Sequence, residues 1–201
     1  MKYKVTFDTN IFVDNKNSAT KKHDCLQYSI EDLFEARFEN KKIELYSVST
    51  TERESKNKGI SIIEIKRNGY GVLQYGNALY GAAIYRKVHE LLEMALIGIS
   101  NIGGSCVVDV ERKEKFLKIM DIICSNNEWR KWDISNLNNS QLRKYNDGLI
   151  FECHVYSGND IFVSNDKKSY IQKESARSKL QSLFATEIYT PNEFGKLLTF
   201  P

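Results

Sequence analysis

Strands are predicted where hydrophobic and polar residues alternate along the chain. At the N-terminus, Val5 and Phe7 alternate with polar neighbours, which predicts a strand over residues 1–7. Short apolar or β-branched runs bounded by turn residues predict the other strands, at Lys42–Val48, Val107–Val110, Ile161–Ser164 and Glu187–Thr190.

Helices are predicted in most of the segments between these strands. Apolar residues spaced three and four apart predict four of them, over Ser29–Asn40, Tyr85–Ile99, Glu111–Cys124 and Ser140–Ser157. Residues 167–183 begin polar and become a weak helix, and Thr190 caps a short terminal helix through Leu198. A helix between two strands indicates a right-handed crossover and parallel strands, so the predicted fold class is α/β.

Length and composition narrow the class of protein further. The chain has 201 residues, which fits one domain with a large insertion, and its net charge of +3 permits an anionic partner without requiring one. The four cysteines form no C-x-x-C pair, which favours free thiols in the cytoplasm. No signal peptide opens the chain, and the longest apolar-rich run, Leu91–Ile102, is shorter than the about 20 residues that cross a bilayer. We therefore expect a cytoplasmic protein with no membrane partner.

Acidic residues follow three of the predicted strands. Asp8 follows the first strand, Glu52 or Glu54 follows the second, and Asp166 follows the strand at Ile161–Ser164. Because ligands collect at the carboxyl ends of strands in an open α/β sheet, these carboxylates are candidates for a shared site. Glu52 and Glu54 lie two positions apart on a predicted helix and point to nearly opposite faces, so at most one belongs to it.

A fourth acid, Asp147, lies next to Gly148 inside the helix predicted at Ser140–Ser157. Neither residue favours a helix interior, where glycine costs about 1 kcal/mol relative to alanine. Two explanations are open: the helix begins after an Asn-Asp-Gly turn, or Asp147 is a site carboxylate.

Helix capping is the competing explanation for the other acids. Aspartate is a favoured N-cap, which would account for Asp8, and acids in a first helical turn complement the helix dipole, which would account for Glu52 and Glu54. Four acids in one crevice would instead repel each other unless a cation neutralised them. An all-oxygen ligand set suits Mg²⁺ or Mn²⁺ better than zinc, and such ions promote phosphodiester hydrolysis.

Four segments, in order, resemble the successive motifs of the PIN-domain nucleases: VTFDTNIFVD, YSVSTTERE, YNDGLIFECHVYSGNDIFVSND and YTPNEF. The resemblance covers the two ends of the chain, about half of it, and residues 59–139 match nothing in the family. It implies a single domain over residues 1–201, with a Rossmann-like three-layer α/β/α fold, a central mostly parallel sheet and an atypical insertion at about 59–139.

The resemblance also assigns roles to residues. It implies that Mg²⁺ or Mn²⁺ is bound by Asp8, Glu54 (in preference to Glu52), Asp147 and Asp166. It gives supporting roles to Asn10, Ser164 and Asp160. Lys167 and Lys168, next to the last acid, are candidates for contacts with substrate phosphates, with a solvated helix start as the alternative.

The function implied is metal-dependent endonuclease cleavage of RNA, with DNA as the alternative substrate. A toxin of a toxin–antitoxin pair is the biological role that the family offers, so an antitoxin protein and a second copy of the chain are further expected partners. Two rivals differ in class. One is a non-catalytic PIN-like module that binds nucleic acid and uses its acids as caps. The other is a phosphoryl-transfer enzyme of the haloacid-dehalogenase type, which needs an aspartate where the chain has Asn10.

Overall fold

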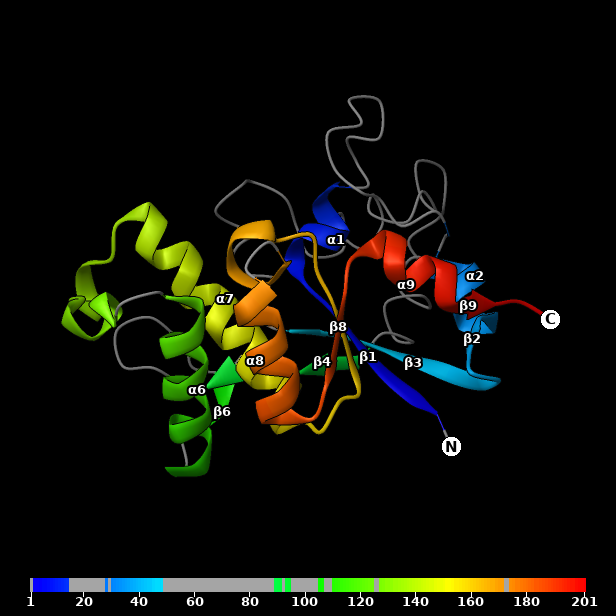
Figure 1. Ribbon diagram of the computed structural model, residues 1–201, viewed down its shortest axis with the longest axis horizontal. Helices are drawn as coiled ribbons and strands as arrows, with labels where there is room; N and C mark the ends of the chain where they lie inside the picture. The colour runs from blue at the N-terminus through cyan, green and yellow to red at the C-terminus, as the bar shows by residue number, and fades with distance from the viewer. Residues whose placement is uncertain are drawn as a thin grey trace.

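A mixed, mostly parallel sheet of seven strands lies at the centre of the fold (Figure 1). The computed structural model describes residues 2–14, 28, 30–48, 89–91, 93–94, 105–106, 110–124, 127–171 and 174–201. The strand order is β8-β7-β1-β3-β2-β9, and β4 also pairs with β3. The strands of this sheet are β1 (Tyr3–Phe7), β2 (Arg37–Phe38), β3 (Lys41–Val48), β4 (His89–Leu91), β7 (Ile161–Val163), β8 (Glu187–Tyr189) and β9 (Leu198–Thr199). Every pairing is parallel except those of β2 with β3 and β9.

Helices pack against this sheet and make the fold α/β. They are α1 (Thr9–Asp14), α2 (Ile30–Glu35), α6 (Val110–Ile123), α7 (Asn139–Tyr156), α8 (Glu174–Phe184) and α9 (Pro191–Leu197). Shorter pieces are the 3₁₀ turns η2 (Glu128–Lys131) and η3 (Ile134–Asn136), the π-helical turn η4 (Lys167–Ile171), and the small parallel pair β5 (Glu93–Met94) and β6 (Ser105–Cys106). No helix in the described part of the chain is long and apolar enough to cross a membrane.

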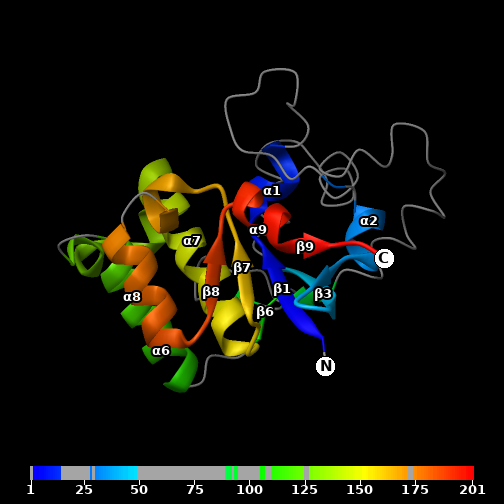
Figure 2. The same ribbon diagram turned by 45° about the vertical axis from the view of Figure 1, so that its right-hand side comes forward.

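Alternate residues of the strands enter two different hydrophobic clusters. In β7, Ile161 and Val163 join the cluster that contains residues of α2 and α9, whereas Phe162 joins the cluster formed with α6, α7 and α8. Figure 2 shows α6, α7 and α8 together on one side of β7 and β8, with α9 and α2 on the other side. Because side chains of a strand point alternately to opposite faces, β3 and β7 contribute residues to both clusters, whereas Val5 and Phe7 of β1 enter the first. The short central strands are thus buried from both sides.

Most of the predicted elements are confirmed, with small changes at their ends. Strands β1, β3, β7 and β8 and helices α6, α7 and α9 lie where the pattern predicts them. Thr190 caps α9 through a reciprocal pair of hydrogen bonds with Glu193. Helix α7 runs unbroken through Asp147 and Gly148, so the turn considered at that point is excluded.

The helix expected over Ser29–Asn40 is wrong in its second half. Helix α2 ends at Glu35, and Glu39 and Asn40 adopt φ angles of 47° and 63°, in the left-handed region. These two residues connect β2 to β3, whose Phe38 and Lys41 are paired. Two consecutive left-handed residues form the tight connection of a β-hairpin and cannot continue a helix.

The helix expected over Tyr85–Ile99 is also wrong for the residues that the structure describes there, which form β4 and β5. A short apolar-rich run can form a strand as well as a helix, and here His89–Leu91 pair with β3. Of the strand expected at Val107–Val110, Val110 begins α6 and the rest lies outside the described residues.

Gly148 has a packing reason for its place inside α7. A Cβ atom added there would lie 2.5 Å from Met120 Sδ and 3.1 Å from Phe116 Cε2, both on α6. The glycine therefore allows α6 and α7 to approach closely. Most of the insertion expected at about 59–139 lies outside the described residues, but α6, which falls within it, shares a hydrophobic cluster with α7 and α8.

Candidate functional site

Asp8 occupies the position directly after β1 and is only 3% exposed. Its backbone N–H donates to the carbonyl of Val163, which continues the pairing with β7. Its Oδ1 accepts a hydrogen bond from Thr9 N at 2.7 Å, while its Oδ2 accepts from Asn10 Nδ2 and Ser164 Oγ, both at 2.6 Å. These donors stabilise the ionised carboxylate in a buried position. The contact with Thr9 resembles a helix cap, and the other two contacts go beyond capping.

Asn10 orients Asp8 and the end of β7 together. Its Oδ1 accepts a hydrogen bond from Asn165 N at 2.9 Å, which fixes the amide so that Nδ2 faces Asp8. Nδ2 also lies 3.2 Å from Ser164 Oγ. Asn10 therefore contacts both Asp8 and Asn165, and its supporting role at a site stays a prediction.

Ser164 connects Asp8 to Asp166. The serine is fully buried, and its Oγ donates to Asp8 Oδ2 while accepting from Asp166 N at 2.9 Å. The Asp166 carboxylate turns back over η4: its Oδ1 accepts from Lys168 N at 2.7 Å and from Ser169 N at 3.0 Å. Its Oδ2 has no hydrogen-bond partner among the described residues. One oxygen of Asp166 is thus held by the backbone and the other is available to a ligand.

Asp147 joins the same group of residues from α7. Its Oδ2 accepts a hydrogen bond from Ser169 Oγ at 2.7 Å, and its carbonyl accepts one from the Tyr170 hydroxyl at 2.5 Å. A continuous chain of hydrogen bonds therefore runs from Asp8 through Ser164, Asp166 and Ser169 to Asp147. We call these five residues the carboxylate chain.

Three of the four acids expected at the site are thus linked, and two further residues were not anticipated. Ser169 and Tyr170 lie in a polar segment with no hydrophobic period to mark them. A weak signal was present, since a serine three residues after an aspartate is well placed to donate its N–H to that side chain. Glu52 and Glu54 lie outside the described residues.

Asp160 lies away from the carboxylate chain, which corrects the supporting role expected for it. It precedes β7 rather than following it, and its Oδ2 accepts from Lys4 N at 2.8 Å at the start of β1. Strands β1 and β7 are parallel, so their first residues lie at the opposite edge of the sheet from Asp8 and Asp166. Asp160 therefore orders the amino ends of these strands.

Lys167 and Lys168 are exposed on η4 and form no ion pair within the described residues. Most of the arginines described on the helices behave differently. Arg112, Arg130 and Arg177 are each bound to a carboxylate. The two lysines beside Asp166 are therefore available to an anionic partner.

The donor set of the carboxylate chain fits a hard cation only in part. In the described ranges, no three His, Cys, Asp or Glu side chains form a group that could hold a metal ion. Serine hydroxyls lie between the acids and satisfy part of their bonding capacity. Mg²⁺ commonly needs only one or two protein carboxylates, however, and the unengaged Oδ2 of Asp166 meets that requirement.

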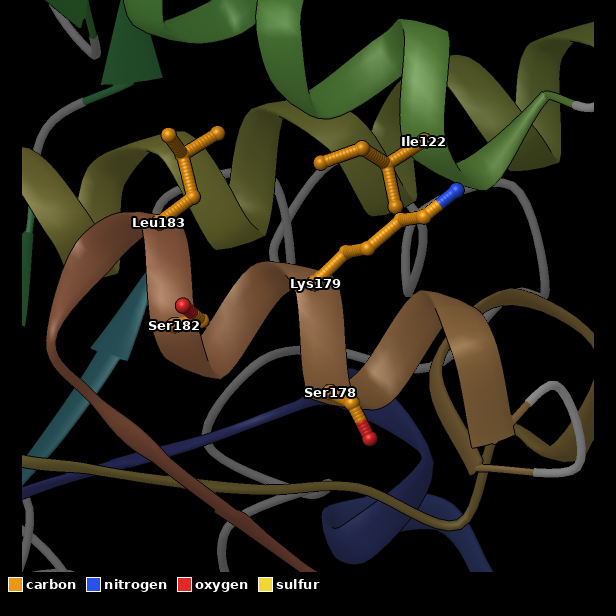
Figure 3. Close-up of a pocket in the computed structure, with 5 residues that line it drawn as sticks. All are labelled: Ile122, Ser178, Lys179, Ser182 and Leu183. Atoms are coloured by element: carbon orange, nitrogen blue, oxygen red, sulfur yellow. The ribbon is translucent and has the colours of Figure 1, made fainter.

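A separate pocket of about 570 Å³ lies between α6 and α8 (Figure 3). It is lined by Ile122 of α6 and by Ser178, Lys179, Ser182 and Leu183 of α8. Figure 3 shows Leu183 and Ile122 on facing helices, with Lys179 reaching across toward Ile122. None of the acids of the carboxylate chain lines this pocket, so we do not place the chemistry there.

His154 forms a buried polar cluster behind β1 that is distinct from the carboxylate chain. Its Nδ1 lies 2.9 Å from Thr6 Oγ1 and its Nε2 lies 2.6 Å from Thr186 Oγ1. Because Thr186 donates its own proton to the Asp160 carbonyl, Nε2 carries the ring proton and Nδ1 accepts from Thr6. Burial lowers the pKa of His154 to about 3, so the ring is neutral in the fold.

Comparisons of the chain with protein-family models, with curated proteins and with solved structures gave no match.

Proposed function

We propose that this chain is a metal-dependent endonuclease of the PIN type that hydrolyses RNA phosphodiester bonds. The observation that carries the proposal is the carboxylate chain, which links acids from the ends of β1 and β7 and from α7 at one edge of a parallel sheet. Ligands bind at that edge in open α/β folds. The PIN-like three-layer arrangement belongs to the same proposal, and the two hydrophobic clusters on alternate strand residues support it.

Asp8, Asp147 and Asp166 would hold the cation, with Glu54 as the fourth ligand expected from the sequence. A bound Mg²⁺ or Mn²⁺ would supply charge stabilisation on the phosphate and an activated water. Asn10 and Ser164 hold the Asp8 carboxylate in a fixed direction through their hydrogen bonds. Such partners reduce the reorganisation needed when a cation binds.

Lys167 and Lys168 would bind the phosphates of the substrate on either side of the cleaved bond. Both are exposed and unpaired within the described part of the chain, and both adjoin Asp166. Lysine acts as a point charge toward phosphate and gives no sequence preference. We therefore propose that the substrate is a polyanion bound largely through its phosphate backbone. Because such binding does not separate RNA from DNA, cleavage of both should be measured.

The sharpest test compares two Asp→Asn substitutions at the two ends of β7. Asp166→Asn keeps its hydrogen bonds, because the asparagine oxygen can accept from Lys168 N and Ser169 N while the amide takes the unengaged position. Asp160→Asn equally keeps its single bond to Lys4 N. The two variants therefore remove a charge without removing a backbone contact, one inside the proposed site and one outside it.

Asp166→Asn should lower the rate of Mn²⁺-dependent cleavage of single-stranded RNA by more than about 100-fold. Loss of a residue that only hydrogen-bonds a metal ligand commonly lowers activity by about 10- to 100-fold, and Asp166 is proposed as a ligand itself. Asp160→Asn should cleave at the parent rate. Equal rates for the parent and Asp166→Asn would contradict the proposed mechanism. Asp8→Asn is a second variant, but its amide must face either Thr9 N–H or Asn10 and Ser164, so its melting temperature has to be measured as well.

A non-catalytic binding module is the second candidate, and specific contacts favour it. Asp8 Oδ1 binds Thr9 N and Asp166 Oδ1 binds two backbone N–H groups, as capping residues do. Isothermal titration with Mn²⁺ separates the candidates, since a protein that uses its acids only as caps binds no ion tightly. A toxin role belongs to the nuclease proposal, and unimpaired growth of bacteria that express the chain alone would count against it.

A further inference from the structure

Ser169 contacts two of the proposed metal ligands at once. Its hydroxyl donates to Asp147 Oδ2 at 2.7 Å, and its backbone N–H donates to Asp166 Oδ1 at 3.0 Å. The residue is 3% exposed, so water does not compete freely for either bond. We infer that Ser169 is a positioning residue that sets the relative orientation of Asp147 and Asp166 for cation binding, an inference that depends on the proposed function.

The two contacts of Ser169 can be separated chemically. The bond to Asp166 uses the backbone N–H and is kept when serine is replaced by alanine or cysteine, whereas the bond to Asp147 needs the side-chain oxygen. Fixing Oδ2 of Asp147 fixes the plane of the carboxylate and hence the direction of its other oxygen. Ser169 therefore controls how Asp147, on α7, faces Asp166, which follows β7. Removing the hydroxyl takes away this contact with Asp147 and leaves the backbone bond to Asp166 in place.

Tyr170 contacts the same turn of α7 through the backbone of Asp147. Its hydroxyl donates to the Asp147 carbonyl, and its ring packs against Phe151 and Phe162 with centroid distances of 5.6 and 5.2 Å. The Tyr170 hydroxyl thus binds the backbone of the helix at Asp147, and Ser169 binds the carboxylate. Comparing substitutions at these two neighbouring residues separates a structural role for Ser169 from a positioning role.

The experiment measures Mn²⁺ affinity and melting temperature for three variants of the full chain. Ser169→Ala removes the hydroxyl from Asp147. Tyr170→Phe removes the bond to the Asp147 carbonyl. Ser135→Ala is the control, because Ser135 Oγ, in η3, donates to the carboxylate of Asp133 at 2.6 Å, and neither residue belongs to the carboxylate chain. Binding is followed by the electron paramagnetic resonance signal of free Mn²⁺, and melting by circular dichroism without metal.

Ser169→Ala should weaken Mn²⁺ binding by about 10- to 100-fold, the loss that removal of an outer partner commonly causes. Tyr170→Phe and Ser135→Ala should bind within about threefold of the parent, although Tyr170→Phe melts at a lower temperature. In an Asp147→Asn background, Ser169→Ala should cause no further loss, because its effect passes through that carboxylate. Should Ser169→Ala fail to fold, Ser169→Cys keeps a weaker donor in nearly the same volume and should show a smaller loss.

Two results would overturn the inference while leaving the nuclease proposal intact. One is a parent that binds Mn²⁺ and a Ser169→Ala variant that binds it equally well. The other is a loss of affinity in Tyr170→Phe as large as that in Ser169→Ala, since helix docking would then explain both. A parent that binds no Mn²⁺ would overturn the proposed function, and the role of Ser169 with it.

Discussion

Ser164 donates a hydrogen bond from its Oγ to Oδ2 of Asp8 at 2.6 Å, joining two strand ends that are 156 residues apart in sequence. The same oxygen accepts from Asp166 N, so one buried hydroxyl serves two of the acids. The neighbouring strands β1 and β7 are parallel and in register at Phe7 and Val163. Asp8 and Ser164, which follow these two residues, therefore lie side by side at the carboxyl ends of the strands. The register of the sheet thus explains why they can form a hydrogen bond.

Ser164→Ala should lower the free energy of unfolding by about 1–3 kcal/mol, because it leaves a buried carboxylate oxygen with one donor fewer and Asp166 N–H without its acceptor. It should also weaken Mn²⁺ binding. Urea unfolding measures the first effect and isothermal titration the second. Ser182→Ala, at an exposed position of α8, is the control and should leave both unchanged. A Ser164→Ala protein as stable as the parent would show that the bond contributes nothing.

Gly148→Ala should destabilise the protein by about 1 kcal/mol. Alanine gains about 1 kcal/mol of helix propensity, but its Cβ would meet Met120 Sδ at 2.5 Å in a buried place, and such overpacking costs about 1–3 kcal/mol. In a Met120→Ala background the closest contact is gone and Phe116 Cε2 at 3.1 Å remains, so the same change should become less destabilising, or stabilising. Urea unfolding of the four proteins measures this difference. If Gly148→Ala alone stabilised the protein, Met120 and Phe116 of α6 would have to move aside at little energetic cost.

Arg112 and Glu152 form a buried ion pair with bonds of 2.6 and 2.7 Å, and their side chains are 3% and 0% exposed. Arg112→Met should lower the free energy of unfolding by about 3–5 kcal/mol, because it leaves the buried carboxylate of Glu152 without its partner. Adding Glu152→Leu should recover most of this loss. The pair of half-buried Lys115 with exposed Glu111 is the comparison, and Lys115→Met should lower the free energy of unfolding by no more than about 0.5 kcal/mol. The comparison is made by chemical unfolding, and a double variant as unstable as Arg112→Met would contradict this account.

His154 should make stability depend on pH below neutrality. Its pKa in the fold is about 3, below the usual value of 6.5, so the unfolded chain binds a proton that the folded chain excludes. The stabilisation is complete above pH 6.5 and declines as the pH falls toward 3. Between pH 7.5 and pH 5 the parent should lose about 2 kcal/mol from this group.

His154→Gln isolates the contribution of His154, since glutamine does not titrate. The measurement is the change in unfolding free energy between the two pH values, compared between the parent and the variant, so any constant loss in the variant cancels. The parent should show the steeper decline. Identical declines would mean that His154 can be protonated within the fold.

Much of the fold could be predicted because the sheet has a simple periodicity. Val5 and Phe7 alternate with polar neighbours and enter one hydrophobic cluster, so β1 is visible in the sequence as an alternation, whereas β7 is visible as a short apolar run. The helix predicted at Tyr85–Ile99 failed because periodicity alone does not separate a short apolar-rich strand from a helix. The hairpin at Glu39 and Asn40 was missed because neither residue is glycine, although both adopt positive φ angles.

The candidate site was predictable where its residues follow strands. Asp8 and Asp166 follow β1 and β7, and the rule for parallel sheets places them together. The same rule places Asp160, which precedes β7, at the other edge, so its assignment to the site conflicted with its own position in the sequence. Asp147 was found through its odd place in a helix, but Ser169 was not, because a serine in a polar turn shows its two partners only in three dimensions.

The most direct measurement is an anomalous-difference map from crystals of the parent grown with Mn²⁺. The account predicts a peak against the carboxylates of Asp8 and Asp166, on the side where Asp147 lies, and no such peak in crystals of Asp166→Asn. Carboxylates that keep only their present hydrogen bonds in the presence of Mn²⁺, with no peak beside them, would contradict it.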